Sequence, residues 1–465
     1  MKLPDGPQTP SFLQLLQWIA RPLELMETCA QRYGDIFTLH LGAYSPIVFI
    51  SNPQAIQEIF TAHPEQFDVG QANRILQPLV GEKSLLMLDS DRHQRQRRLL
   101  MPPFHGDRMR AYSKLICDIT LSVIDQWKLD EPFAVRSSMQ EISLRVILQA
   151  VFGLNEGQRF QQLNQLLRAI LDVTGSPLSS SLLFFKILQK DLGAWSPWGR
   201  FVRQKQQIEQ LLNREIQERR DQADFSGSDI LTLLMSARDE QGQPLTDTEL
   251  RDELMTLLVA GHETTASALT WALYWIHHLP EVHERLLKEL DTVGDGADLS
   301  AVARLPYLTA VCSETLRIYP VGMLAFARIV KSPLQLMGYD FEPGTMLAPC
   351  IYLTHQREEL YPEPKRFNPE RFLERHYSPY EYLPFGGGNR RCIGMAFAQF
   401  EMKLVLATIL SRWHLAIAGS RPVKPVRRGV TLAPASGRWL VVTESASATT
   451  NRCSSRTLAQ LKNIS

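Results

Sequence analysis

The 465-residue sequence lacks features that mark several large classes of protein. Neither sign of charge is in excess, because 50 Lys and Arg residues face 49 Asp and Glu residues and give a formal net charge of +1. A chain with balanced and interspersed charge has no overall attraction for a phosphate backbone. We therefore expect no nucleic-acid partner.

Cysteine is scarce, and its spacing is wide. No CxxC pair occurs among the six cysteines, which are Cys29, Cys117, Cys312, Cys350, Cys392 and Cys453. Small secreted domains carry much denser cysteine frameworks, so this pattern favours a reducing cytoplasm. The first 20 residues contain three prolines and do not resemble a cleavable signal.

No hydrophobic run is suited to crossing a membrane. The longest mainly apolar stretch, residues 254–279, has His262 and Glu263 near its centre, where an ionised side chain in lipid would be costly. We expect a buried helix there and no transmembrane anchor. A shorter apolar run at residues 182–188 leaves two alternatives open, a short buried helix or peripheral contact with a membrane surface.

Helical periodicity dominates residues 100–320, where apolar side chains recur three and four positions apart. Strand patterns occur at residues 37–51, 334–349 and 430–443. The sequence therefore predicts a mainly α protein with a small β region. We expect residues 1–444 to form the folded domain and residues 445–465, rich in Ser, Thr and Ala, to form a flexible tail.

The longest predicted helix begins at a capping box formed by Thr246 and Glu249 and ends before Pro280. At 1.5 Å per residue it would span roughly 50 Å. A helix that is apolar on nearly every face should be buried on nearly every face. The polar residues 262–265 at its middle therefore require an explanation.

Residues 385–394 combine glycines, two arginines and Cys392 immediately before another helical pattern. The start of a helix presents unpaired N–H groups and the positive end of the dipole, which favour a thiolate and hence a metal ligand. A lone cysteine is more often a buried, inert side chain. The complete run favours a metal ligand.

This run resembles the cysteine loop of the cytochrome P-450 superfamily, with the pattern Phe-x-x-Gly-x-Arg-x-Cys-x-Gly. The fixed positions are all matched, by Phe385, Gly388, Arg390, Cys392 and Gly394. The resemblance covers residues 5–444 and suggests a bacterial or cyanobacterial-like member. It implies the cytochrome P-450 fold, with a long central helix over haem b, Cys392 as the iron ligand, and Phe385, Gly386 and Ala260 as haem contacts.

Two arginines and a glutamate resemble another landmark of the family. Glu314 and Arg317 have the spacing of a Glu-x-x-Arg helix, and the segment around Arg371 would bring a second arginine to them. Taken alone, a pair at this spacing is most often a surface ion pair worth a few tenths of a kcal/mol. The resemblance implies a buried structural triad of Glu314, Arg317 and Arg371.

Residues 260–265 resemble the oxygen-activation segment of the family. Thr264 would bind dioxygen, Glu263 would belong to the proton relay, and Gly261 would remove a side chain where the helix faces the haem. The alternative for Thr264 is a hydroxyl bonded only to its own helix. The propionates would be held by His93, Arg97, Arg328 and Arg390, although many relatives have tryptophan at the position of His93.

The resemblance implies a monooxygenase that activates dioxygen and hydroxylates a substrate. No ionisable residue stands out in the segments expected to line the pocket, which favours an apolar substrate such as a fatty acid, hydrocarbon or terpenoid. Two alternatives are an enzyme that uses or rearranges peroxides, for which Thr264 would be unusual, and a haem sensor without turnover.

The chain contains no flavin or nicotinamide fingerprint, so electrons must come from an external donor. We expect a small acidic ferredoxin, supplied by its reductase. Clustered positive charge steers acidic partners, and the expected docking residues are Arg92, Arg95, Arg98 and Arg391.

Overall fold

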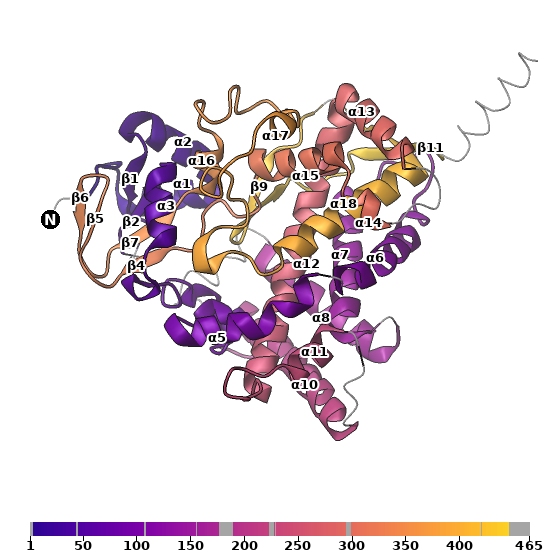
Figure 1. Cartoon of the computed structure of the whole chain (residues 1–465), viewed down its shortest axis with the longest axis horizontal. Helices are drawn as coiled ribbons and strands as arrows, with labels where there is room; N and C mark the ends of the chain where they lie inside the picture. Colours follow the sequence, from indigo (N-terminus) through magenta and orange to yellow (C-terminus); the bar gives the residue numbers. More distant parts are fainter. Residues whose placement is uncertain are drawn as a thin grey trace, which may run out of the picture.

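The computed structural model describes residues 3–42, 45–106, 108–154, 156–175, 189–222, 227, 229–293, 299–419 and 421–445. Figure 1 shows α12 (Asp247–His278) running through the middle of a mainly helical molecule, with most strands gathered to one side. The predicted fold class, mainly α with a small β region, is confirmed. The remaining α-helices are α1 (Ser11–Ala20), α2 (Pro22–Tyr33), α3 (Pro53–Thr61), α4 (Gln77–Val80), α5 (Ser90–Leu100), α6 (Arg108–Ile124), α7 (Val135–Phe152), α8 (Gln158–Gly175), α10 (Pro197–Gln222), α11 (Ile230–Ser236), α13 (Pro280–Asp291), α14 (Leu299–Val302), α15 (Pro306–Ile318), α16 (Ile351–His355), α17 (Arg371–Glu374) and α18 (Met395–Arg412).

The central helix begins and ends as its sequence predicts. Thr246 is the N-cap, and its hydroxyl accepts from the Glu249 N–H while the Glu249 carboxylate accepts from the Thr246 N–H. The helix stops at His278 because Pro280 begins α13. Most of its side chains are buried, since α7, α15 and α18 all pack against it (Figure 1).

A five-stranded sheet forms most of the β region. Its order is β1-β2-β7-β4-β3, with β2 and β7 parallel and the other neighbours antiparallel. Its strands are β1 (Ile36–Leu39), β2 (Ile47–Ile50), β3 (Phe67–Asp68), β4 (Arg328–Val330) and β7 (Met346–Pro349). Three two-stranded sheets pair β5 (Leu334–Leu336) with β6 (Tyr339–Phe341), β8 (Trp413–Ile417) with β11 (Leu440–Ser445), and β9 (Pro425–Arg428) with β10 (Thr431–Pro434).

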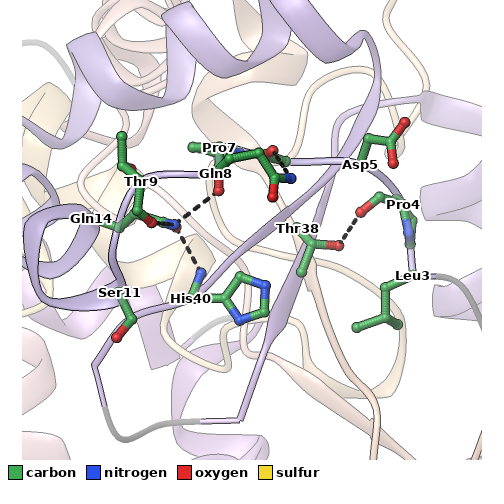
Figure 2. Close-up of a pocket in the computed structure, with 11 residues that line it drawn as sticks. Leu3, Pro4, Asp5, Pro7, Gln8, Thr9, Ser11, Gln14, Thr38 and His40 are labelled. Atoms are coloured by element: carbon green, nitrogen blue, oxygen red, sulfur yellow. Dashed lines mark hydrogen bonds between the residues drawn. The ribbon is translucent and has the colours of Figure 1, made fainter.

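The N-terminal segment is tied to the sheet through β1. Figure 2 shows Gln14 donating to the carbonyls of Pro7 and Thr9 and accepting from the His40 N–H, while Thr38 donates to the Pro4 carbonyl. A side chain on Gly6 would strike the Thr38 carbonyl oxygen. These contacts surround a pocket of about 350 Å³. The polar side chains of Gln14 and Thr38 are satisfied by the protein itself, so we assign no ligand to the pocket.

Some predicted boundaries were wrong. The helical periodicity of residues 107–129 predicts a helix to Leu129, but α6 ends at Ile124, and Leu129 and Phe133 instead form bridges to β11. Within the described ranges, no helix combines the length and the apolarity needed to cross a bilayer. The apolar run at residues 182–188 and the tail from residue 446 onward lie outside the described residues.

Candidate active site

The loop that carries Cys392 is shaped by glycines pressed against α3. Gly386 and Gly388 have positive φ angles of 66° and 63°, which side chains rarely adopt. A Cβ atom on Gly387 would lie 2.3 Å from the ring of Phe60, and one on Gly388 would lie 2.5 Å from the Phe60 carbonyl oxygen. The Cys392 N–H donates to the Phe385 carbonyl (3.0 Å) and closes the loop. Only glycine allows this close approach to Phe60.

Cys392 lies just before α18 and is solvent-accessible although other protein groups surround it. This enclosure raises the pKa of its thiol, whereas the Gly394 N–H, Arg97 and Arg391 act to lower it. The helix start lowers the pKa of Cys392 as the sequence argument expects, but burial outweighs it. A bound metal cation deprotonates a coordinating thiol outright and would reverse the balance.

Glu314, Arg317 and Arg371 are brought together in the core. Glu314 and Arg317 on α15 are 0% exposed and Arg371 on α17 is 7% exposed. Arg317 donates to both carboxylate oxygens of Glu314, from Nε at 2.6 Å and from Nη2 at 2.8 Å. Arg371 Nε donates to Glu314 Oε1 at 3.2 Å. The other N–H groups of Arg317 and Arg371 donate to backbone carbonyls, so the charges and hydrogen bonds of the triad are largely satisfied.

His355 connects this triad to the cysteine loop. Arg317 Nη1 donates to the His355 carbonyl (2.8 Å), and the Leu383 N–H donates to His355 Nε2 (3.0 Å). Tyr382, next to Leu383, donates from its hydroxyl to the Ser313 carbonyl on α15 (3.0 Å). The segment that enters the cysteine loop is therefore fixed to α15 directly by the Tyr382 hydroxyl and to α16 by the Leu383 N–H. His355 and Tyr382 had no recognisable signal in the sequence.

A second buried group consists of the four basic residues expected to hold propionates, His93, Arg97, Arg328 and Arg390. The first two lie on α5, Arg328 begins β4, and Arg390 precedes Cys392. Burial and neighbouring guanidinium groups lower the pKa of His93 to about 3, of Arg328 to about 9 and of Arg390 to about 10. The pKa of Arg97 is also lowered, mainly by burial. The three guanidinium groups therefore repel one another in a poorly solvated region, and His93 stays neutral beside them.

Asp89 is the carboxylate that partly balances this group. Arg390 Nη2 donates to it and to the Leu88 carbonyl (2.6 Å), while the carboxylate also accepts from the Val69 and Gly70 N–H groups. Within the described part of the chain, Arg390 Nε has no acceptor. Asp89 was missed by the sequence argument because nothing local links it to a loop 300 residues away.

The middle of α12 is accessible on one side, although the helix is buried before and after it. Ala260 is exposed and Thr264 is half-buried. The Thr264 hydroxyl donates to the Ala260 carbonyl (2.5 Å). This is the bond expected under the alternative interpretation, in which the hydroxyl bonds only to its own helix. The exposed strip of α12 nevertheless leaves both residues open to a bound group.

Gly261 and Glu263 face α7. A Cβ atom on Gly261 would lie 2.9 Å from Ile147 Cδ1, so the glycine permits close packing of α7 on α12. The prediction that Gly261 faces the cofactor was therefore wrong. Glu263 forms an ion pair with Arg136 and accepts from Gln140 (3.0 Å), and both partners lie on α7.

Comparison with known proteins agrees with the cysteine loop. A sequence model described as Cytochrome P450 matches residues 4–441. The chain belongs to the cytochrome P450 family. It is 37% identical to the Mycobacterium tuberculosis protein named cytochrome P450 135B1 over 438 residues, covering 94% of this chain and 90% of that protein. It is 32% identical to cytochrome P450 138 of the same organism over 444 residues, covering 95% and 96%. Neither name states a substrate.

Solved P450 structures show the same fold. Retinoic acid-bound cyanobacterial CYP120A1 has a TM-score of 0.80 and 25% identity, covering 96% of this chain and 100% of that one. The cytochrome P450DA haem domain also has a TM-score of 0.80, with 23% identity and coverage of 95% and 97%. The predicted family and fold are therefore confirmed, and the chain is a haem-thiolate monooxygenase of this family.

The cofactor of this P450 is haem b, and the residues present fit it. The group formed by His93, Arg97, Arg328 and Arg390 lacks sufficient negative charge, and two propionates would provide it. An accessible sulfur at Cys392 suits an iron ligand, and the exposed strip at Ala260 leaves room on α12. The expected haem ligand and the expected propionate partners are therefore all compatible with this group.

The arginines expected to dock a ferredoxin differ in their surroundings. Arg92, Arg98 and Arg391 are exposed, but Arg95 is half-buried and pairs with Asp239 (2.6 Å) and Glu249 (3.4 Å). Arg98 also pairs with exposed Glu240. The guanidinium of Arg95 is engaged in joining α5 to Asp239 and to Glu249 in the first turn of α12, so its charge is partly compensated.

Proposed function

We propose that this P450 hydroxylates an apolar substrate, with Thr264 and Glu263 in proton delivery and an external ferredoxin as electron donor. The observation that carries the substrate class is the apolar character of segments packed on α12. Both α4 and β10 contact this helix, and the Leu432 N–H donates to the Val321 carbonyl (2.8 Å). The side chains that these and adjacent segments supply are Leu76, Leu79, Leu86, Met87, Val321, Met323, Leu324, Leu432 and Ala433.

A solved relative supports an isoprenoid or fatty-acid-like substrate. The cyanobacterial CYP120A1 structure is titled as bound to retinoic acid, which is an isoprenoid carboxylic acid. Its identity to this chain is 25% over nearly the whole length. A long apolar molecule of this class would suit the leucine, methionine and valine side chains expected at the pocket. The ligand of the relative supports the class of substrate and leaves its identity to experiment.

The haem, when bound, supplies dioxygen activation with electron donation from the Cys392 thiolate. The protein's contribution on the other side is a hydroxyl and a carboxylate. Thr264 presents its hydroxyl at the exposed strip of α12, where rotation away from the Ala260 carbonyl would free it to donate to an incoming ligand. Glu263 would pass protons from solvent if it exchanged its contacts with Arg136 and Gln140 for water.

The electron donor would approach the side of the molecule that carries Cys392. Arg92 and Arg391 are exposed, and among the described residues neither has a carboxylate partner. Their positive charge would attract an acidic ferredoxin. Charge reversal at both positions should lower the ferredoxin-driven rate and its salt dependence. An unchanged rate would place the docking surface elsewhere.

The substrate class is tested by titrating the ferric holoprotein with fatty acids, alkanes and isoprenoids and recording the type I spectral shift. We expect a shift with at least one long apolar compound, and a shift with none of them would refute the apolar substrate. Cys392→Ser should lose the red-shifted band of the ferrous carbonyl complex. Thr264→Ala should keep that band and consume oxygen without a matching yield of product. Coupled turnover in the Thr264 variant would remove this residue from proton delivery.

A further inference from the structure

Residues 83–89, which we call the 83–89 segment, join the expected substrate pocket to the cysteine loop. Leu86 and Met87 are among the apolar residues expected at the pocket. At the other end of the segment, Arg390 donates to the Leu85 carbonyl (3.4 Å), the Leu88 carbonyl (2.6 Å) and the Asp89 carboxylate. A displacement of this segment would therefore change both the pocket wall and the position of Arg390.

Two adjacent acidic residues of α12 hold this segment. The Lys83 N–H donates to Asp252 Oδ2 (2.9 Å), and the Leu85 N–H donates to Glu253 Oε1 (2.6 Å). Thr256, one turn further along α12, donates to the Ser84 hydroxyl (2.7 Å). A Cβ atom on Gly81, whose φ is +93°, would lie 2.3 Å from the Asp252 carboxylate. The chain therefore lies directly on one face of α12.

The two carboxyl oxygens of Glu253 are buried and bonded unequally. Glu253 is 0% exposed. The Leu85 N–H and Gln96 Nε2 both donate to Oε1, whereas Oε2 has no partner among the described residues. An ionised carboxylate would place charge on both oxygens, and a buried oxygen without a donor is costly when charged. The bare Oε2 is therefore the place for the proton.

The charged neighbours of Glu253 favour the same state. Burial, with smaller contributions from Asp252 and Glu249 on α12, raises the pKa of Glu253 to about 8, although the hydrogen bonds from Gln96 and the Leu85 N–H act to lower it. Arg251 is engaged with Asp252, and Arg95 is engaged with Asp239 and Glu249. From α5 the facing group is Gln96, which is neutral and also donates to the Lys83 carbonyl (2.7 Å). The segment itself donates to Glu253 from the Leu85 backbone N–H.

We propose that Glu253, as a neutral acid, is a positioning residue that fixes the 83–89 segment on α12 and so sets the affinity for an apolar substrate. The effect on affinity rests on the proposed function, whereas the fixing of the segment does not. Ionisation strengthens the two hydrogen bonds at Oε1, but it also places an unpaired charge at the buried Oε2, which draws in water and separates the segment from α12. Binding should therefore weaken as the pH rises through the range in which Glu253 ionises.

The first experiment is amide hydrogen exchange across residues 83–89 in the holoprotein at pH 7 and pH 9, corrected for intrinsic exchange rates. We expect protection in the wild type to fall roughly tenfold by pH 9, since the neutral fraction of an acid falls tenfold per pH unit above its pKa. Glu253→Gln keeps an acceptor oxygen and cannot ionise, so its protection should not change with pH. A wild-type segment equally protected at both pH values overturns the proposal, even without any variant.

The second experiment is a spectral titration of the same holoproteins with dodecanol, an uncharged apolar probe. The wild-type Kd should rise about tenfold from pH 7 to pH 9, and the Kd of Glu253→Gln should stay constant. The matched control is Glu401→Gln on α18, because Glu401 is 1% exposed and burial also raises its pKa to about 8. This control should retain the wild-type pH dependence.

The outcomes separate the two proposals. If Glu253→Gln weakens binding equally at both pH values, Glu253 has only a packing role and the proposal fails. The same conclusion follows if Glu401→Gln abolishes the pH dependence as well. If dodecanol and the other apolar compounds give no shift in the wild type at any pH, the apolar-substrate proposal fails. Hydrogen exchange still decides in that case whether Glu253 fixes the segment.

Discussion

Two groups of ionisable residues meet the cysteine loop, one through His355 and the other through Arg390, and they differ in how their charges are compensated. In the triad, Glu314 accepts from Arg317 and Arg371, and the rest of each guanidinium donates to backbone carbonyls. In the other group, Arg97, Arg328 and Arg390 repel one another beside a neutral His93, and Asp89 binds only Arg390 among them. The triad is complete within the protein, whereas the second group requires an anion.

The comparison shows that burial of charge can serve two purposes. A compensated group joins segments that are distant in sequence, and removing one member leaves its partners unpaired. An uncompensated group lowers the stability of the ligand-free protein, and binding of an anionic ligand restores that stability. The two groups should therefore respond oppositely to the loss of one charge.

The largest effect is expected from Glu314→Gln. Two guanidinium groups would then lie in the core without a carboxylate, at a cost of about 3–5 kcal/mol, which is a large part of the stability of a typical domain. We expect little folded protein and little carbonyl-binding pigment, measured by yield and thermal unfolding. The matched control is Glu363→Gln, because the Glu363–Arg366 pair has the same spacing but is exposed. A stable Glu314 variant would contradict the structural role of the triad.

The next effect should have the opposite sign in the ligand-free protein. Arg328→Met removes a buried cation that repels Arg390, so the apoprotein should gain about 1–3 kcal/mol of stability. The holoprotein should lose haem faster, because a propionate loses a partner. Denaturant unfolding of the apoprotein and haem transfer to excess apomyoglobin measure the two quantities. A less stable apoprotein would show that Arg328 is compensated after all.

A smaller effect concerns pH. The pKa of His93 is lowered to about 3, so the folded apoprotein does not take up the proton that the unfolded chain accepts near pH 6.5. Apoprotein stability should therefore fall as the pH decreases from 6.5, by about 1.4 kcal/mol per unit for each such histidine. Buried His262 and His355 act in the same direction.

The contribution of His93 is the difference in slope between the wild type and His93→Phe in denaturant unfolding from pH 4.5 to 6.5. This difference should shrink in the holoprotein, because propionates favour the imidazolium form. If the difference in slope is the same with and without haem, His93 does not interact with the propionates.

The smallest effect is expected from Arg136→Gln, which tests a partly exposed pair. Arg136 and Glu263 are each 13% exposed, so the pair should contribute about 1 kcal/mol or less to stability. Glu263 would be freer to exchange protons, and we expect the solvent isotope effect on kcat to change while the Kd for substrate stays constant. If the Kd changes and the isotope effect does not, the pair belongs to substrate binding.

Local patterns predicted much of this molecule. Residues close in sequence determine the capping box at Thr246 and the cysteine loop. They also determine the start of α3, where Asn52 caps the helix and Pro53 is its first residue. Contacts between distant segments were not predictable in this way. Phe60 against Gly387, and Arg136 on Glu263, involve pairs that only the fold brings together.

Gly261 illustrates why a correct motif can carry a wrong explanation. The sequence shows that a side chain is missing from the helix, but the side on which space is needed depends on neighbouring helices. Arg95 illustrates the same limit for charge. Its sequence neighbours suggested an exposed basic patch, whereas the carboxylates that bind it come from residues 239 and 249.

The contact between Gly261 and Ile147 restricts how the sequence can diverge. An added methyl group at position 261 would lie 2.9 Å from the Ile147 side chain, too close unless that side chain becomes smaller. A change from glycine to alanine at position 261 should therefore be accompanied by a change from isoleucine to valine or alanine at position 147. Relatives that differ at one site would be expected to differ at both, so the two positions should covary although they lie more than 100 residues apart in the chain.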